Sequence, residues 1–229
     1  MRAGAAWSSR WVIACSLGEL LGLGFAAFVA YGVMLRAGAT EDPGAQLLVA
    51  LAMVGAGAAE GAITATLQWR VLVERYTALP LGRFIAFTSL VAAVGWAAGM
   101  IPPIVHSGQA APVVEPPMAV ILGFASVFGA TAGALFGVAQ WFVLRAHAAR
   151  AGRWIAANAI GWSIGLPITY VGGSVPAEGG GPLPVVLAGA LSGLLAGASV
   201  ALATLVALRR MPARSEQAGG SHGLTLRHA

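Results

Sequence analysis

Two carboxylic acids, Glu19 and Glu60, stand in the middle of long apolar stretches of this sequence. Glu19 lies nine residues after Arg10, and Glu60 lies ten residues before Arg70. If these stretches are helices that cross a bilayer, about 1.5 Å per residue places both carboxyls roughly 14–15 Å from the arginine-marked end. Carboxyls at that depth are costly and commonly bind protons or ions. The two acids therefore predict proton or small-cation chemistry, and the alternative is two protonated acids with a structural role.

Glu19 and Glu60 are expected to be neighbours, because both fall near the middle of consecutive, antiparallel helices. Burial disfavours a charged carboxyl, and a second carboxyl nearby disfavours ionisation of both. No basic residue lies within two turns of either acid inside its stretch. We therefore expect at least one of them to carry a proton at neutral pH, with a shared proton or a bound cation between them.

Three amide side chains, Gln68, Gln140 and Asn158, also lie within apolar stretches. At about 100° per residue, each falls on or near a line of glycines on its own helix, so the amides point to where helices meet. Interhelical hydrogen bonding is the structural interpretation, and a polar lining of a pathway is the functional one. Gln140 lies five residues before Arg145 and Asn158 five residues after Arg153, so we expect these two amides to be partners.

Every apolar stretch carries glycines four residues apart, which stack on one face of a helix. Such faces let helix backbones approach closely in a membrane. We expect them to pack within one bundle rather than to form a dimer interface. The glycines assigned to packing are Gly57, Gly61, Gly129, Gly133, Gly137, Gly161, Gly165, Gly193 and Gly197.

Motifs for enzymatic or metal chemistry are missing from the sequence. It has no H-E-x-x-H and no G-x-S-x-G segment, and Asp42 is its only aspartate. The four histidines lie outside the apolar stretches, and Cys15 is the single cysteine. We therefore predict no catalytic site, no metal centre and no cofactor.

The composition is that of a membrane protein. Of the 229 residues, 58% are hydrophobic and 9% are charged, against roughly 25% charged in a soluble domain. Apolar runs of about 20 residues span a bilayer as helices, and no alternation typical of a barrel strand is present. The sequence predicts an all-α bundle of six transmembrane helices, at Trp11–Leu35, Leu47–Leu72, Phe84–Val105, Met118–Leu144, Trp154–Gly172 and Leu183–Leu208.

Arginine positions predict the orientation. All 13 basic residues are arginine, and twelve of them fall on one side of the predicted spans, with only Arg36 on the other. The positive-inside rule places the twelve, and both termini, in the cytoplasm. Glu41, Asp42, Glu115 and Glu178 then lie outside. The arginines are spread over short loops and form no basic face with interleaved aromatics, so we predict no nucleic-acid binding.

The chain also carries an internal repeat. Arg10-Trp11 and Arg153-Trp154 open two of the spans, and Gln68-Trp69 and Gln140-Trp141 close two others. We therefore predict three tandem helical hairpins, at about residues 10–75, 83–147 and 153–210, related by an axis along the membrane normal. Together they form one transmembrane domain over residues 1–208, followed by a disordered cytoplasmic tail at 209–229.

This pattern resembles a group of bacterial membrane proteins with repeated G-x3-G-x2-Q-W-x-V-L-R segments, each followed by a Trp-led helix. The resemblance covers about 200 residues and implies an architecture but no activity. The second span departs from it at Ala65, where a glycine is expected. The residues that carry the resemblance best are Gly133, Gly137, Gln140, Trp141, Val143, Leu144 and Arg145.

Two functions remain open from the sequence. The first is a multi-pass protein of the inner (plasma) membrane that transports a small solute or ion through the acids. The second is a structural or assembly protein that serves as a packed scaffold or partner subunit. The expected partners are the lipid bilayer, a small ion or solute, and a second copy or another subunit.

Overall fold

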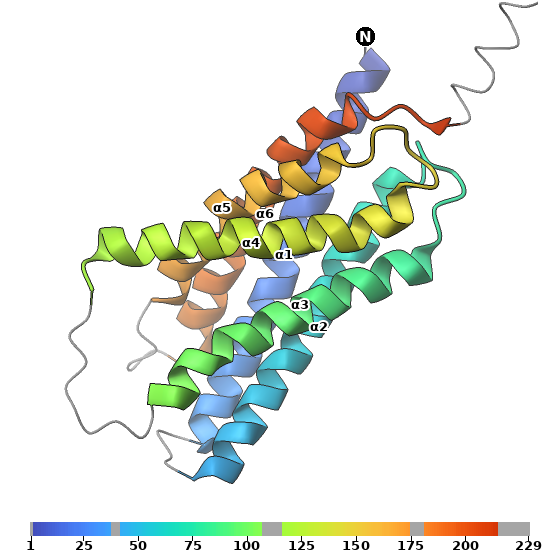
Figure 1. The fold of residues 1–229 in the computed structure, drawn as a ribbon. Helices are drawn as coiled ribbons and strands as arrows, with labels where there is room; N and C mark the ends of the chain where they lie inside the picture. The colour runs from blue at the N-terminus through green and yellow to red at the C-terminus, as the bar shows by residue number, and fades with distance from the viewer. Residues whose placement is uncertain (1, 38–41, 107–115, 175–180, 215–229) are drawn as a thin grey trace, which may run out of the picture.

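The computed structural model describes residues 2–37, 42–106, 116–174 and 181–214, and within them the protein is all-α (Figure 1). Apart from one isolated bridge between Ala148 and Ala213, no extended pairing occurs among these residues. The six helices are α1 (Arg2–Ala37), α2 (Pro43–Leu72), α3 (Leu81–His106), α4 (Met118–Leu144), α5 (Arg153–Gly173) and α6 (Pro182–Leu208).

Local signals set several helix starts. Asp42 caps α2, because its carboxylate accepts a hydrogen bond from the backbone N–H of Ala45 at 2.9 Å, and Pro43 follows in the first turn. Pro182 begins α6 after Gly181, whose φ of +68° is a conformation that suits glycine. The predicted spans agree with the helices, except that α1 begins earlier, at Arg2.

Five of the helices, all but α5, have segments that are long and apolar enough to cross a bilayer. Helix α5 is the shortest of the six and includes Asn158, Ser163 and Pro167. Large apolar side chains are exposed along the outside of the bundle, as at Phe124, which is 73% exposed. An apolar exterior on long helices is what a lipid environment requires, so the chain is a multi-pass membrane protein.

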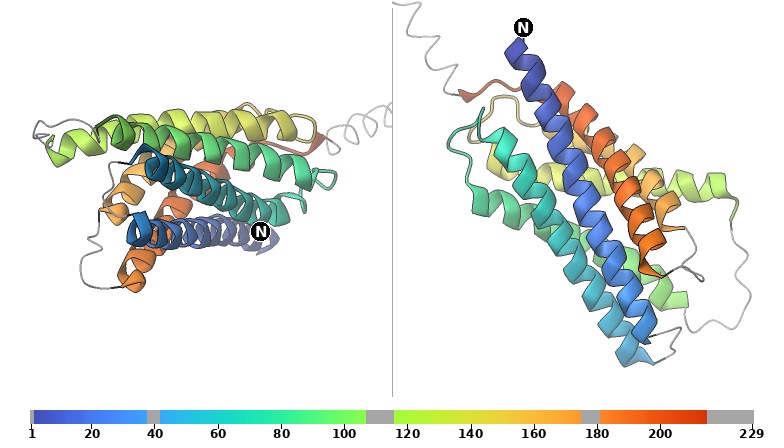
Figure 2. Two further views of the ribbon diagram at one scale, coloured as in Figure 1. Left: turned by 90° about the horizontal axis from the view of Figure 1, so that it is seen from below. Right: turned by 180° about the vertical axis from the view of Figure 1, so that it is seen from behind.

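The helices close into a ring. Each packs mainly against two others, and the order around the ring follows the chain from α1 to α6, with α6 returning to α1. The view from behind shows α1 lying between α2 and α6 (Figure 2). A closed ring gives every helix an inward face, and polar residues on those faces meet in the centre.

The interface between α3 and α4 is the weakest in the ring. The two helices diverge toward the end of α3 and the start of α4 (Figure 1). Near those ends, a Cβ added to Gly95, Gly99 or Gly123 would meet no atom within 4 Å. Farther along α4, a Cβ on Gly137 would lie 2.6 Å from the Cα of Ile155 in α5. The ring therefore has one loosely packed seam.

Polar contacts fasten the opposite end of the bundle. The Tyr76 hydroxyl donates to the carbonyl of Met211 at 2.7 Å. Arg10 and Glu74 form a two-bond ion pair, at 2.8 and 2.7 Å, between α1 and the turn after α2. These contacts hold the ends of α1, α2 and α6 together.

The chain after α6 differs from the expectation of a disordered tail that begins at residue 209. Residues 209–214 pack against the turns that follow α2 and α4, where the Arg214 N–H donates to the His147 carbonyl at 2.9 Å. Residues 215–229 lie outside the described residues, as do the predicted outer-loop acids Glu41, Glu115 and Glu178.

Candidate functional site

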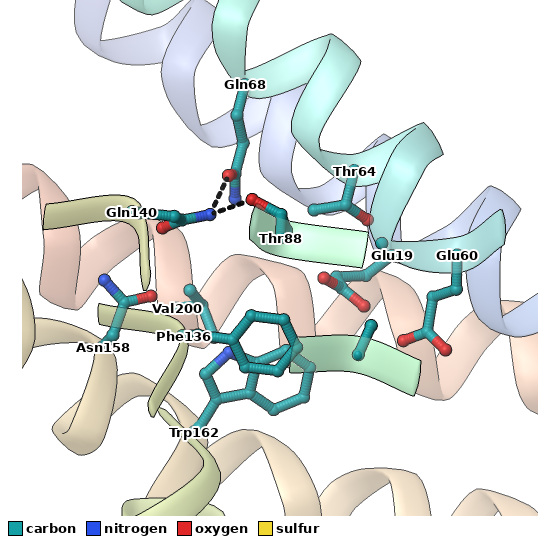
Figure 3. Close-up of a pocket in the computed structure, with 12 residues that line it drawn as sticks. Glu19, Glu60, Thr64, Gln68, Thr88, Phe136, Gln140, Asn158, Trp162 and Val200 are labelled. Carbon is teal, nitrogen blue, oxygen red and sulfur yellow. Dashed lines mark hydrogen bonds between the residues drawn. The ribbon is translucent and has the colours of Figure 1, made fainter. Parts of the chain in front are cut away.

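A small cavity lies at the centre of the ring and has a volume of about 20 Å³. Every helix contributes to its wall (Figure 3). A cavity of this size holds about one water molecule. The side chains and glycine that line it are Glu19, Glu60, Gly61, Thr64, Gln68, Thr88, Ala92, Phe136, Gln140, Asn158, Trp162 and Val200.

Glu19 of α1 and Glu60 of α2 both reach this cavity and are 5% and 7% exposed. A close helix crossing brings them there. A Cβ on Gly18 would lie 2.9 Å from the Cα of Thr64, and one on Gly22 would lie 2.6 Å from the Cγ of Glu60. The lack of side chains on these glycines lets α2 approach α1, and the two carboxyls share one side of the cavity (Figure 3).

Trp96 of α3 is the hydrogen-bond donor to Glu60. Its indole Nε1 lies 2.7 Å from Glu60 Oε2. The indole ring occupies the space in which a side chain at Gly57 would lie, so this glycine allows α3 to reach the acid. The interaction ties the site to the helix at the loose seam.

Two oxygens at the site lack a hydrogen-bond partner among the described residues. They are Oε2 of Glu19 and Oγ1 of Thr64, and both residues are buried. The Glu19 carboxyl lies beside the Glu60 carboxyl and the Thr64 hydroxyl, but these two oxygens make no hydrogen bond of standard geometry among the described residues. Buried polar atoms are nearly always satisfied in folded proteins. The two atoms therefore mark a place where the protein alone does not complete the hydrogen bonding.

A second polar group, which we call the amide network, adjoins the acids. Gln140 of α4 donates to Thr88 of α3 at 3.1 Å and to Gln68 of α2 at 3.3 Å. Its carbonyl accepts a hydrogen bond from the Trp154 indole of α5 at 2.8 Å. Gln68 in turn donates to the Cys15 sulfur of α1 at 3.6 Å. The network joins five helices with hydrogen bonds that satisfy both amides.

The expected pairing of Gln140 with Asn158 is wrong. The Asn158 amide donates to the Trp154 carbonyl of its own helix at 2.9 Å, and the Trp154 indole takes the place beside Gln140. Similar depth put the two amides near one cavity. Depth does not fix rotation about the helix axis, however, and the larger indole fills the interface.

The nine glycines assigned to packing all lie at helix crossings. An added Cβ on any of them would meet atoms of another helix within 4 Å. At Gly161 that Cβ would lie 2.7 Å from the Cα of Val200, and at Gly197 it would lie 2.6 Å from the Cys15 carbonyl. By contrast, Gly95 and Gly99, which share the same spacing, face open space.

Several residues of the cavity and the amide network were not assigned from the sequence, among them Trp96, Trp154 and Thr88. The two tryptophans belong to segments that the repeat singles out, but spacing does not give the direction of an indole. No group of three or more acidic, histidine or cysteine side chains that could hold a metal ion occurs in the part of the chain that the structure describes.

No family model, curated protein or solved structure matches this chain. Its function is therefore argued from its own residues.

Proposed function

We propose that the protein moves a proton or a small ion across the membrane through the centre of the helix ring. The observation that supports this most is the pair of acids, Glu19 and Glu60, at one cavity walled by all six helices. Ionisable groups inside a membrane bundle cost several kcal/mol when charged, about 2.5–3.5 on insertion scales, and usually mark ion or proton pathways. None of the arginines in the described segments lines the cavity to neutralise them.

The conformation described is closed. The cavity holds about one water molecule, and the amide network lies between the acids and the end of the bundle where Tyr76 contacts Met211. Passage would therefore require helices to separate. The seam between α3 and α4 is where the least packing is lost, and Trp96 connects α3 to Glu60.

The test is ion flux in liposomes that contain the purified protein and a pH-sensitive dye. We expect flux driven by a pH or cation gradient in the wild type and its loss in the Glu19→Gln/Glu60→Gln double variant, because the amide cannot exchange a proton. The matched control is Glu74→Gln, which breaks the exposed ion pair with Arg10 and should leave the flux unchanged. Equal flux in wild-type and empty liposomes would contradict the proposal.

The second candidate is a structural or assembly protein without transport. The amide network favours it, since completed hydrogen bonds around Gln140 fix helix packing without any pathway. Under this alternative the double glutamine variant would fold and support every cellular role of the wild type. Its partner would be another subunit or a second copy.

We further propose that both termini are cytoplasmic and that the protein lies in the inner membrane of a bacterium, as in the group it resembles. The arginine distribution supports this orientation. With Cys15 replaced, single cysteines would be placed at Asp42 and at Ala146, which is exposed in the turn after α4. Only the cysteine at Asp42 should react with an impermeant thiol reagent added from outside, and labelling at Ala146 would contradict the orientation.

We also propose that the ring consists of three tandem hairpins, α1–α2, α3–α4 and α5–α6, with α5 as the sixth span. Several equivalent positions are equally buried. The aromatic residue that follows Arg10, Arg83 or Arg153 in the odd-numbered helices is fully buried, and so is the leucine that ends each even-numbered helix. These triplets are Trp11, Phe84 and Trp154, and Leu72, Leu144 and Leu208.

Polar contacts support the same repeat. Within a hairpin, the polar residue near the end of the even-numbered helix donates to the odd-numbered one. Between hairpins, a tryptophan donates to that same polar position. The pairs are Gln68–Cys15 and Gln140–Thr88 within hairpins, and Trp11–Thr204 and Trp154–Gln140 between them.

A further inference from the structure

The unpartnered oxygens at the acid pair identify what the cavity takes. Glu19 is 5% exposed and Thr64 is 4% exposed, yet Oε2 of the first and Oγ1 of the second have no partner among the described residues. A buried polar group without a partner costs free energy. A ligand in the cavity that both residues line would satisfy the two oxygens together.

The size of the cavity limits the ligand to one small species. Its volume of about 20 Å³ suits a single water-sized particle. Bulky side chains, Phe136, Trp162 and Val200, also line the cavity. An organic solute does not fit in this conformation.

The charge of the wall selects a cation. Two carboxyls face the cavity, and no arginine from the described part of the chain lines it. Trp96 supplies one N–H to Glu60. The unpartnered atoms are oxygens, which are the ligands that hard cations prefer. An anion would meet two acids without a basic partner.

The number of oxygens selects a monovalent ion. Calcium takes six to eight oxygen ligands, and magnesium keeps several of its waters. Two carboxyls and one hydroxyl provide too few oxygens for calcium, and a space for one particle leaves no room for the waters of magnesium. A sodium-sized ion with one carboxyl protonated would leave the site electrically neutral, which a low-dielectric interior favours.

We propose that Glu19, Glu60 and Thr64 form a binding site for one dehydrated sodium-sized cation at the centre of the bundle. This inference rests on the proposed function, because the ion would be the one that is carried or coupled. The site is single: the positions that match Thr64 in the other two hairpins are Phe136 and Val200, which have no side-chain oxygen.

The test is the thermal stability of the purified full-length chain in detergent, with NaCl replacing choline chloride at constant ionic strength and pH. A ligand that binds only the folded state raises the melting temperature with its concentration. We expect a saturable rise with sodium. Tryptophan fluorescence should change over the same concentrations, because the Trp96 indole is bonded to Glu60. The change should be smaller in Trp96→Phe, where only Trp162 in the cavity wall remains to report it.

Variants locate the site. Thr64→Val should raise the sodium concentration for half-maximal effect at least about tenfold, the usual minimum loss when a group that supports a metal site is removed. Thr66→Val is the matched control, because that hydroxyl donates to the Ala62 carbonyl of its own helix, and its sodium response should equal that of the wild type. Glu19→Gln should abolish the rise in melting temperature with sodium. If this variant does not fold, the result for Thr64→Val decides whether the cation site exists.

The outcomes separate this inference from the proposed function. No sodium effect, or equal effects in wild type and Thr64→Val, would overturn the cation site. If acid but not sodium stabilises the wild type, the acids share a proton instead; the cation site is then overturned while proton transport stands. If sodium stabilises the protein as expected but liposomes show no flux, the cation site stands and the transport proposal fails.

Discussion

The α1–α2 pair and the α5–α6 pair cross in the same way. Gly18 of α1 lies against Thr64 of α2, and Gly161 of α5 lies against Val200 of α6. An added Cβ would come within 2.9 Å of the Thr64 Cα in the first pair and within 2.7 Å of the Val200 Cα in the second. The close approach of two backbones is therefore common to both pairs.

The chemistry that the two pairs present to the cavity is different. One turn from these contacts, Gly22 lies against Glu60 in the first pair, and Gly165 lies against Ala196 in the second. Glu19 of α1 likewise corresponds to Trp162 of α5, and both line the cavity. Since the same crossing forms with alanine and tryptophan, packing does not require the acids. This difference is the reason to assign the acids a function rather than a structural role.

The largest expected effect concerns the close backbone crossing that both helix pairs have. Gly161→Leu would force a side chain into the backbone of α6 and should destabilise the bundle by about 3 kcal/mol, the upper end for overpacking. Gly95→Leu is the control, since a Cβ there meets no atom within 4 Å, and it should leave stability unchanged or raise it slightly. Unfolding in mixed detergent micelles measures both, and equal losses would contradict the role of the crossing.

A smaller effect is expected at the polar contacts that flank the crossings. Gln140→Leu removes hydrogen bonds with Gln68, Thr88 and Trp154. At about 0.6 kcal/mol for each bond in a membrane bundle, the loss should be roughly 2 kcal/mol.

The matched variant is Thr204→Val at the equivalent position of α6. It removes the interaction with the Trp11 indole, at 3.1 Å, and should cost about 0.6 kcal/mol by the same measure. The same unfolding assay in micelles compares the two variants. If Thr204→Val lowers the free energy of unfolding as much as Gln140→Leu does, the amide network does not stabilise the bundle more than the single Trp11–Thr204 hydrogen bond.

Much of the fold could be predicted from the sequence, because the length of each apolar segment and the arginines that flank it are local properties of the chain. The predicted end of α4 at Leu144 and of α6 at Leu208 agree with the structure. The meeting of Glu19 and Glu60 followed from depth alone, since both lie mid-helix in consecutive helices. Depth is a position along the helix axis alone, and the helical rise of about 1.5 Å per residue fixes it well.

Rotation and partner choice could not be predicted in the same way. Asn158 has the depth of Gln140 but bonds to its own helix, because the Trp154 indole occupies the interface. Gly95 and Gly99 have the spacing of packed glycines, yet nothing lies against them. Spacing shows that a helix face carries only small residues, but the position of the neighbouring helix determines whether that face is packed.

The seam between α3 and α4 is the place where the repeat fails, and the aligned positions suggest a cause. Val91 stands where the other hairpins have Gly18 and Gly161, and Phe136 stands where they have Thr64 and Val200. Two bulky side chains at the crossing prevent the close approach that glycine allows. The Phe136 ring instead stacks on Trp162 of α5, with centroids 5.7 Å apart.

The smallest expected effect is therefore a change of geometry rather than of stability. In Val91→Gly/Phe136→Val, the α3–α4 pair acquires the residues found at the α5–α6 crossing, and the two helices should move together. Spin labels on the exposed positions Leu90 and Leu135 would report a shorter distance by pulsed electron resonance. Val94→Gly is the control, because Val94 is exposed on α3 and takes no part in the crossing. If the distance stays the same in the double variant, bulk at these two positions does not open the seam, and the divergence of α3 and α4 must come from their connections to α2 and α5.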